Sequence, residues 1–188
     1  MAEPKHIPIP LLRQTVRLDS EAGRLYWLSR PSEMFDEGKQ SREQNAAIWN
    51  ARYAGKEAFA TWNAQGYRRG TVLNKQHLAH HVVFALHYGR WPTAGVDHRD
   101  GDRSNNRPDN LREASQRQNC RNQRAKGGTS PYKGVSWAKR KLRWVTMARD
   151  AEGRQRFIGY FLDEIEAARA YDAFARREHG EFARLNFP

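Results

Sequence analysis

Four polar side chains between positions 97 and 119 have the types and the spacing that suit phosphodiester hydrolysis. Asp97 and His98 are adjacent, Asn110 follows His98 by 12 residues, and Asn119 follows it by 21. An imidazole, with an unperturbed pKa of about 6.5, can take a proton from water near neutral pH. Carboxylate and amide oxygens are hard ligands for a divalent cation, which neutralises charge on the transition state. The set therefore indicates metal-assisted cleavage of a phosphodiester bond.

The surrounding sequence predicts the elements that would bring these side chains together. Val96–His98 has the pattern of a short strand, 99–110 is a polar loop rich in Gly, Asn and Asp, and 111–114 is a second strand. Ser115 and Gln118 have the spacing of a capping box, so a helix is expected to begin at Ser115 and to carry Asn119 in its first turns. A strand, a loop, a strand and a helix can gather all four residues.

This stretch resembles the HNH nucleases of phages and mobile introns over about residues 65–122. The resemblance rests on Val96-Asp97-His98 through Asn110-Leu111-Arg112, on Gln118-Asn119, and on the preceding 78–83 and 88–92. It implies a ββα-metal fold that holds one divalent cation, Mg²⁺ in the first place, with Mn²⁺ or another transition metal as alternatives. By the same resemblance His98 is the general base, Asp97 and Asn119 bind the metal, and Asn110 braces the His98 loop.

Each of these assignments has a simpler alternative. His98 can be an exposed loop histidine, and Asn110 can be a turn or cap residue. Asn122 lies one helical turn from Asn119 and competes with it as the metal ligand. His77, His80 and His81 have no accompanying Cys or Asp, so they are left out of the metal site, although His80 can lie at the edge of the active site.

The charge of the chain indicates a polyanionic partner. The net charge is +12, and residues 103–156 hold 15 Lys and Arg against 4 Asp and Glu. The partner expected is double-stranded DNA, and no membrane association is expected. A basic stripe with helical spacing is formed by Arg117, Arg121 and Arg124. This stripe either contacts phosphates or is a solvated helix face.

With one cysteine and no apolar leader segment, we expect a cytoplasmic, non-secreted protein, in the host cytoplasm if it is phage-encoded.

A second pattern, three strands and a helix, begins after the linker-like 126–131. The strands are expected at 132–137, 143–149 and 155–161, and the helix is expected from Asp163 to Gly180. The residues resemble the APETALA2-type (ethylene-response-factor) DNA-binding domain in Tyr132-Lys133-Gly134-Val135, Arg143-Trp144, Ile158-Gly159-Tyr160-Phe161, Glu166–Asp172 and Leu185–Pro188. The resemblance implies a three-stranded antiparallel sheet on the DNA major groove, with the helix packed behind it.

Strand alternation predicts which side chains of this module face the DNA. Arg143, Val145, Met147 and Arg149 share one face, and Trp144, Thr146 and Ala148 face the helix. Ser136, Ala138, Gln155 and Phe157 stand where plant members carry Arg or Trp, so the target sequence does not carry over. The DNA-binding residues expected in this module are Lys133, Lys139, Arg140, Lys141, Arg143, Arg149, Gln155 and Phe157.

Together these patterns predict an α+β protein with a ββα-metal HNH centre and a three-stranded antiparallel sheet packed on one helix. The expected organisation is an N-terminal region of undetermined role (1–64), an HNH nuclease domain (65–125), a linker (126–131) and an APETALA2-type domain (132–188). The expected function is a metal-dependent DNA endonuclease of the homing or phage HNH type. A sequence-specific DNA-binding regulator with an inactive HNH centre is the alternative. The sequence does not determine whether the protein is a monomer or a homodimer, or whether it nicks one DNA strand or cleaves both.

Overall fold

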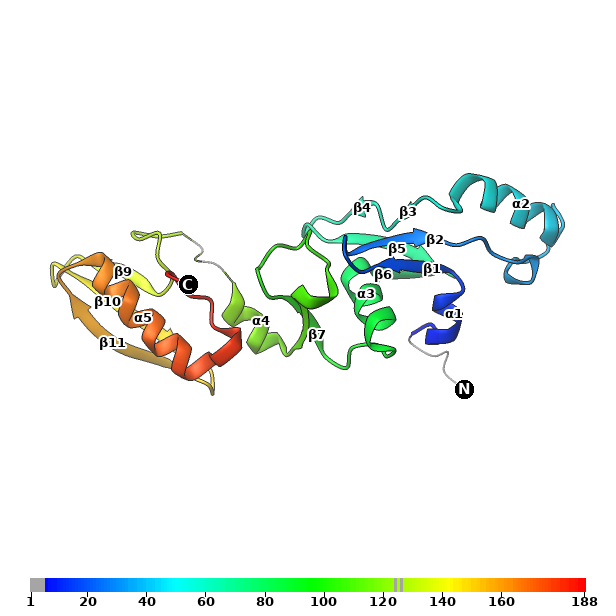
Figure 1. Ribbon diagram of the computed structural model, residues 1–188. Coiled ribbons are helices and arrows are strands. Elements are labelled where there is room, and N and C mark those ends of the chain that lie inside the picture. Colours follow the sequence, from blue (N-terminus) through cyan, green and yellow to red (C-terminus); the bar gives the residue numbers. More distant parts are fainter. Residues whose placement is uncertain (1–5, 124, 126) are drawn as a thin grey trace. The chain divides into compact units, whose positions relative to one another are not determined.

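A computed structural model describes residues 6–123, 125 and 127–188, and the chain divides into two compact units, Met1–Glu113 and Ala114–Pro188 (Figure 1). Helices and small antiparallel sheets occur in both units, so the predicted α+β class is confirmed. Within the described part of the chain, no helix is long and apolar enough to cross a membrane.

The first unit is built from two three-stranded antiparallel sheets, a strand pair and helices. The sheets have the strand orders β1-β2-β3 and β4-β5-β6, and β7 pairs with β8. The elements are α1 (Ile9–Arg13), β1 (Val16–Asp19), β2 (Arg24–Trp27), η1 (Ser32–Met34), α2 (Arg42–Tyr53), β3 (Glu57–Ala58), β4 (Thr61–Trp62), β5 (Arg68–Val72), β6 (Lys75–Leu78), α3 (Ala79–Tyr88), β7 (Gly95–His98), η2 (Pro108–Asn110) and β8 (Leu111–Ala114).

Local backbone preferences explain where these elements end. The helix α2 stops at Tyr53, and Phe59 has a φ of 58°, which a helix interior does not accommodate. The hairpin between β5 and β6 turns at Leu73 and Asn74, which both have positive φ. Val16 begins β1.

One hydrophobic core joins the N-terminal elements to α3 and to β8. Leu12, Val16 and Leu25 belong to the same buried cluster as Val82 and Leu111, and all five are almost fully buried. Residues before position 64 therefore pack in the same unit as α3 and β7. The predicted boundary between an N-terminal region (1–64) and a nuclease domain (65–125) stays a prediction.

The second unit contains the predicted three-stranded sheet and its helix. The strands β9 (Val135–Ala138), β10 (Arg143–Arg149) and β11 (Gln155–Phe161) are antiparallel in the order β11-β10-β9, and α5 (Glu164–His179) lies along the sheet (Figure 1). Small residues on α5 allow a close approach: the Thr146 hydroxyl donates to the carbonyl of Ala167, 3.0 Å away, and both residues are fully buried. The short helices α4 (Gln116–Asn122) and η3 (Gly180–Phe182) complete the unit.

Candidate active site

The strand β7 places two chemically active side chains inside the first unit. Asp97 and His98 are each only 4% exposed. The loop that follows is closed at its base by a hydrogen bond, 2.8 Å long, from the Arg99 amide to the Asn110 carbonyl. The strand, loop and strand expected from the sequence are therefore present, although His98 is buried and is not an exposed loop histidine.

Asp97 is paired with an arginine on the neighbouring strand. Arg112, in β8, donates from Nε (3.0 Å) and from an Nη2 group (2.8 Å) to Oδ2 of Asp97. Both side chains are almost completely buried. The pair balances the charge of the buried carboxylate, because a buried charge without a partner is costly. It also fixes the carboxylate beside His98.

His98 is held in one orientation by an asparagine of the loop. Its Nε2 lies 2.9 Å from Oδ1 of Asn106, and both side chains are buried. An amide oxygen can only accept, so this contact favours the tautomer that carries its proton on Nε2, in which Nδ1 is the basic nitrogen. Burial lowers the pKa of His98, whereas the Asn106 bond and the neighbouring Asp100 carboxylate act in the opposite direction. The neutral, proton-accepting form is therefore favoured near pH 7.

Aromatic rings surround His98 on the side of α3. The ring of His80 packs edge-on against it, with 5.1 Å between centroids, and the ring of Tyr67 stacks on it at 6.1 Å. Burial lowers the pKa of His80 to about 2, so His80 is a neutral neighbour at physiological pH. The prediction that His80 lies at the edge of the site is consistent with this packing.

The Asn110 side chain holds the loop at three points. Its Oδ1 accepts from the amide of Asp100 (3.1 Å), and its Nδ2 donates to the Asp100 carboxylate (3.0 Å) and to the carbonyl of Asn105 (2.8 Å). These bonds join the start of the loop to its end. The expected bracing contacts are present, and whether they serve catalysis stays a prediction.

The N-terminal hairpin also contacts this loop. Gly23, in the turn between β1 and β2, has a φ of +65°, and a Cβ there would lie 2.4 Å from the Arg107 nitrogen and 2.5 Å from the Asn106 carbonyl carbon. Arg107 in turn donates through Nε to the carbonyl of Glu21. The first hairpin therefore supports the segment that holds His98, which gives residues before position 64 a structural part in the site.

The predicted metal ligands fall in different compact units. Asp97 is in the first unit, whereas α4, with Asn119, is in the second. Asn119 is half-buried, and its competitor Asn122 is 5% exposed. Among the described residues, no group of three or more His, Cys, Asp or Glu side chains is arranged to hold a metal ion. A pairing of Asp97 with Asn119 therefore stays a prediction.

The helix α4 has the predicted capping box, in which Ser115 and Gln118 bond reciprocally. Its last turn contacts the sheet module. The Lys133 ammonium donates to the carbonyls of Arg121 and Gln123, and Arg121 donates to the carbonyls of Asp150 and Ala151. These contacts engage the side chains of Lys133 and Arg121, both of which the sequence predicts to bind DNA. Their contacts with DNA stay predictions.

The other predicted DNA-binding side chains are distributed as the strand alternation indicates. Thr146 and Ala148 are buried against α5, whereas the opposite face of β10 is open. Phe157 is 55% exposed, an unusual position for a phenyl ring on a sheet. The exposed members of the predicted set are Arg117, Lys139, Arg140, Lys141, Arg143, Arg149, Gln155 and Phe157; Arg124 lies outside the described residues.

Three residues of the site were not identified from the sequence, namely Asn106, Arg112 and Gly23. Asn106 and Arg112 lie within the motif that carries the family resemblance, but nothing in the spacing distinguishes Asn106 from Asn105 or assigns a partner to Arg112. Gly23 is 83 positions before Asn106, and a Glu-Ala-Gly turn indicates only a hairpin.

Comparisons with known proteins found several similarities. A family model described as HNH endonuclease matches residues 77–121. Protein 3.8 of Escherichia phage T7 is 40% identical over 93 residues, which cover 48% of this chain and 74% of the phage protein. The structure titled "DNA binding and cleavage by the HNH homing endonuclease I-HmuI" is 19% identical, covers 76% of this chain and 71% of that chain, and has a TM-score of 0.38.

A plant protein matches as well. Dehydration-responsive element-binding protein 2D of Arabidopsis thaliana is 39% identical over 84 residues, which cover 40% of this chain. The match spans only 38% of the plant protein's length. The family model includes Asp97, His98, Asn110 and Asn119, and the phage relative is matched over most of its length. On these grounds, the chain belongs to the HNH endonuclease family.

Proposed function

We propose that this protein is a metal-dependent DNA endonuclease of the homing or phage HNH type, in which His98 is the general base. The observation that carries the proposal is the buried bond between His98 Nε2 and Asn106. It supports a neutral imidazole whose Nδ1 accepts a proton. A general base has to be deprotonated before it acts, and burial of His98 favours that state.

The proposed reaction is the hydrolysis of one phosphodiester bond. His98 takes a proton from water at Nδ1, and the water oxygen forms a bond to phosphorus. The bond between phosphorus and the 3′ oxygen breaks, and that oxygen takes a proton from solvent. The products carry a 5′-phosphate and a 3′-hydroxyl. Asn106 orients the imidazole of His98, the general base, and Asn110 keeps the loop closed around it.

The donor chemistry of Asp97 and Asn119 fits a hard divalent cation such as Mg²⁺. Asp97 supplies a buried carboxylate in β7, which Arg112 holds through Oδ2. The partial exposure of Asn119 supports it over the buried Asn122. When bound, the cation would stabilise negative charge on the phosphate and on the leaving oxygen.

We further propose that the sheet module positions the nuclease on double-stranded DNA. The exposed face of β10 and β11 carries Arg143, Arg149 and Gln155, and the tip between β9 and β10 carries three consecutive cationic residues. Guanidinium groups suit guanine edges and phosphates. Phosphate contacts at the tip would orient the module without specifying a sequence.

Plasmid cleavage tests the catalytic part. Supercoiled DNA is incubated with the protein and Mg²⁺ or Mn²⁺, with and without EDTA, and the ends are mapped. His98→Ala should abolish cleavage and keep DNA binding, whereas His87→Ala, at an exposed position of α3, should leave both unchanged. Undiminished cleavage by His98→Ala contradicts the assignment. DNA binding without cleavage by the wild-type chain identifies a regulator with an inactive centre instead.

Electrophoretic mobility shifts test the positioning part. Arg143→Gln should weaken binding to duplex DNA about fivefold or more, because it removes a contact to a base or a phosphate. Arg169→Gln makes the same change of charge at an exposed position of α5 and should have a much smaller effect. Equal effects of the two substitutions mean that net charge, rather than the sheet face, governs binding.

A further inference from the structure

An arginine in the first unit is buried without an ionic partner among the residues that the structure describes. Arg30, three residues after β2, is 8% exposed. Its backbone is fixed by Asn50 of α2, which accepts from the Arg30 amide and donates to the Arg30 carbonyl, each over 2.9 Å. Its guanidinium carbon lies 4.0 Å from the ring centroid of Trp49 and 5.1 Å from that of Trp27. The side chain is therefore held in place between two indoles.

The charge of Arg30 has no anion among the described residues. Its Nε is buried and has no hydrogen-bond partner, and no carboxylate of the described chain pairs with the guanidinium. Burial accordingly lowers the pKa of Arg30. Cation–π contacts offset part of the desolvation, but a buried cation without an anion remains unfavourable. A buried unsatisfied group of this kind needs an explanation, and a bound ion is one that fits a cation.

Arg30 lines a cavity of about 560 Å³ that has aromatic walls. Four half-buried aromatic residues contribute to it, and the polar groups at its rim are exposed. The cavity lies beside α2, which Figure 1 places at the end of the first unit away from β7, so it is separate from His98. The aromatic residues are Trp27, Phe35, Trp49 and Tyr53, and the polar residues of the rim include Asp36, Thr71 and Asn74.

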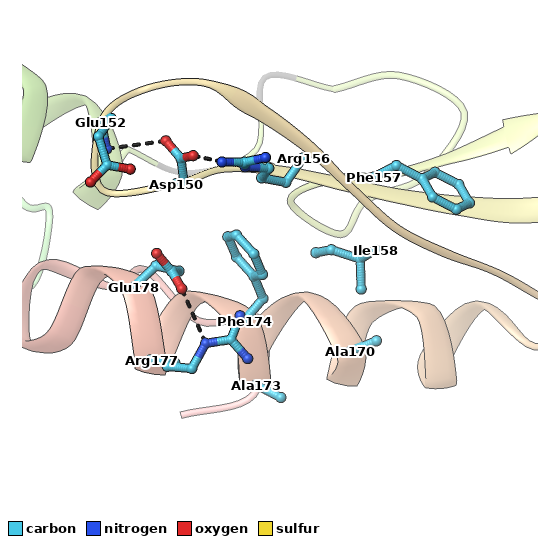
Figure 2. A pocket seen from close by; sticks show the side chains of 10 residues that line it. All are labelled: Asp150, Glu152, Arg156, Phe157, Ile158, Ala170, Ala173, Phe174, Arg177 and Glu178. Carbon is cyan, nitrogen blue, oxygen red and sulfur yellow. Dashed lines mark hydrogen bonds and ion pairs between the residues drawn. The ribbon is translucent and has the colours of Figure 1, made fainter.

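A cavity of the second unit provides a contrast. It measures about 620 Å³ and lies between β11 and α5. As Figure 2 shows, its cations have anionic neighbours: Arg156 pairs with Asp150, and Arg177 pairs with Glu178. That cavity has no unsatisfied charge to offer a ligand, whereas the cavity at Arg30 has one.

We propose that the cavity at Arg30 binds one nucleotide of an unpaired DNA strand, with its phosphate on Arg30 and its base stacked on the aromatic walls. A phosphate supplies the anion that Arg30 lacks. Aromatic side chains stack with any base, and the volume is of the size of small-molecule sites. Asp36 and Asn74 offer acceptors at the rim for base N–H groups. The proposal rests on the proposed function only in taking DNA as the ligand.

Binding is measured on the full chain in EDTA, so that no cleavage occurs. The probes are dTMP, thymidine, inorganic phosphate and the oligonucleotide dT8, and the readouts are calorimetry and the indole N–H signals of the tryptophans. We expect dTMP to bind more tightly than thymidine or phosphate, and dT8 at least as tightly as dTMP. Failure of dTMP and dT8 to bind overturns the proposal. Equal affinity for phosphate and dTMP overturns the stacking of the base. If dTMP binds and dT8 does not, the assignment of a DNA strand as the ligand is overturned.

Variants separate a binding role of Arg30 from a structural one. Arg30→Met keeps the stem and removes the charge, so binding of dTMP should fall about tenfold or more while the Tm is unchanged or higher. Arg52→Met, at an exposed arginine of α2, is the matched control and should bind normally. A lower Tm with unchanged binding in Arg30→Met means that the guanidinium only holds the two indoles, and overturns the proposal. His98→Ala should bind dTMP as the wild type does. Failure of the nuclease assignment can therefore be distinguished from failure of the nucleotide site.

Discussion

The Nε2 nitrogen of His98 lies 2.9 Å from the Oδ1 oxygen of Asn106, in the interior of the first unit. The bond joins the strand β7 to the far end of the loop that follows it. It holds the imidazole in one direction and favours the tautomer protonated at Nε2, because an amide oxygen accepts only from a protonated nitrogen. Position 106 is therefore expected to influence catalysis through the orientation of His98.

Asn106→Leu should lower kcat for plasmid cleavage about 10- to 100-fold, the usual cost of losing a partner that orients a functional histidine. KM and DNA affinity should change little. Asn106→Asp keeps an acceptor oxygen and should retain more activity than the leucine variant. Nitrogen NMR shifts of the His98 ring report the tautomer, which should lose its preference in Asn106→Leu. Wild-type kcat together with an altered tautomer would show that the bond is dispensable.

Gly23→Ala should lower both stability and cleavage. A methyl group at this position collides with the backbone of Asn106 and Arg107, and the positive φ adds about 1 kcal/mol of strain. Gly66→Ala is the control, because Gly66 also has a positive φ but has no neighbour within 4 Å of its Cβ position. Thermal unfolding and plasmid cleavage are measured for both. Equal loss in the two variants would mean that strain alone, rather than the contact with the loop, is responsible.

Arg112→Met should destabilise the first unit by about 3–5 kcal/mol, because it leaves the Asp97 carboxylate buried without its cation. Urea denaturation measures the change. Arg90→Met breaks the more exposed pair with Glu113 and should cost about 1 kcal/mol or less. The double variant Asp97→Asn, Arg112→Met should recover part of the loss. Similar costs for the buried and the exposed pair would contradict this account.

Glu113 gives the first unit a stability term that depends on pH. The side chain of Arg90 and the amide of Thr93 donate to its carboxylate and lower its pKa to about 2, from 4.5. The folded state therefore releases the proton more readily than the unfolded state. The stabilisation is complete above pH 4.5 and is lost as the pH falls towards 2. The difference in unfolding free energy between the wild type and Glu113→Gln should shrink over this range, and a constant difference would rule out the linkage.

Gly134→Ala should unfold or distort the second unit. A Cβ at Gly134 would lie 2.1 Å from a ring carbon of Tyr171, a core residue, and the φ of +79° adds strain. The near-UV circular dichroism that Trp137 and Trp144 contribute should be lost, and DNA binding with it. Gly153→Ala also has a positive φ, but its Cβ would meet only an arginine side chain, Arg117, at 3.6 Å, so it should keep the fold. A native spectrum for Gly134→Ala would contradict the packing.

Much of the local structure follows from the sequence because its causes act over a few residues. The capping box at Ser115 starts α4, and period-two alternation assigns Thr146 and Ala148 to the buried face of β10. The strand, loop and strand around Asp97 and His98 are likewise predicted by their own residues. Motif and spacing were sufficient to indicate the family.

Tertiary structure decided how these side chains are held, because partners distant in the sequence cannot be assigned by spacing. Asn105, Asn106 and Asn110 are of one type in one loop, and only the folded loop places Asn106 on His98. The Arg112 pair depends on the pairing of β7 with β8, and the Gly23 contact on a hairpin formed 83 residues earlier. Burial also left Arg30 without an anion in the described part of the chain, which the sequence does not predict. The sequence determined which groups are available, and packing determined their protonation, orientation and partners.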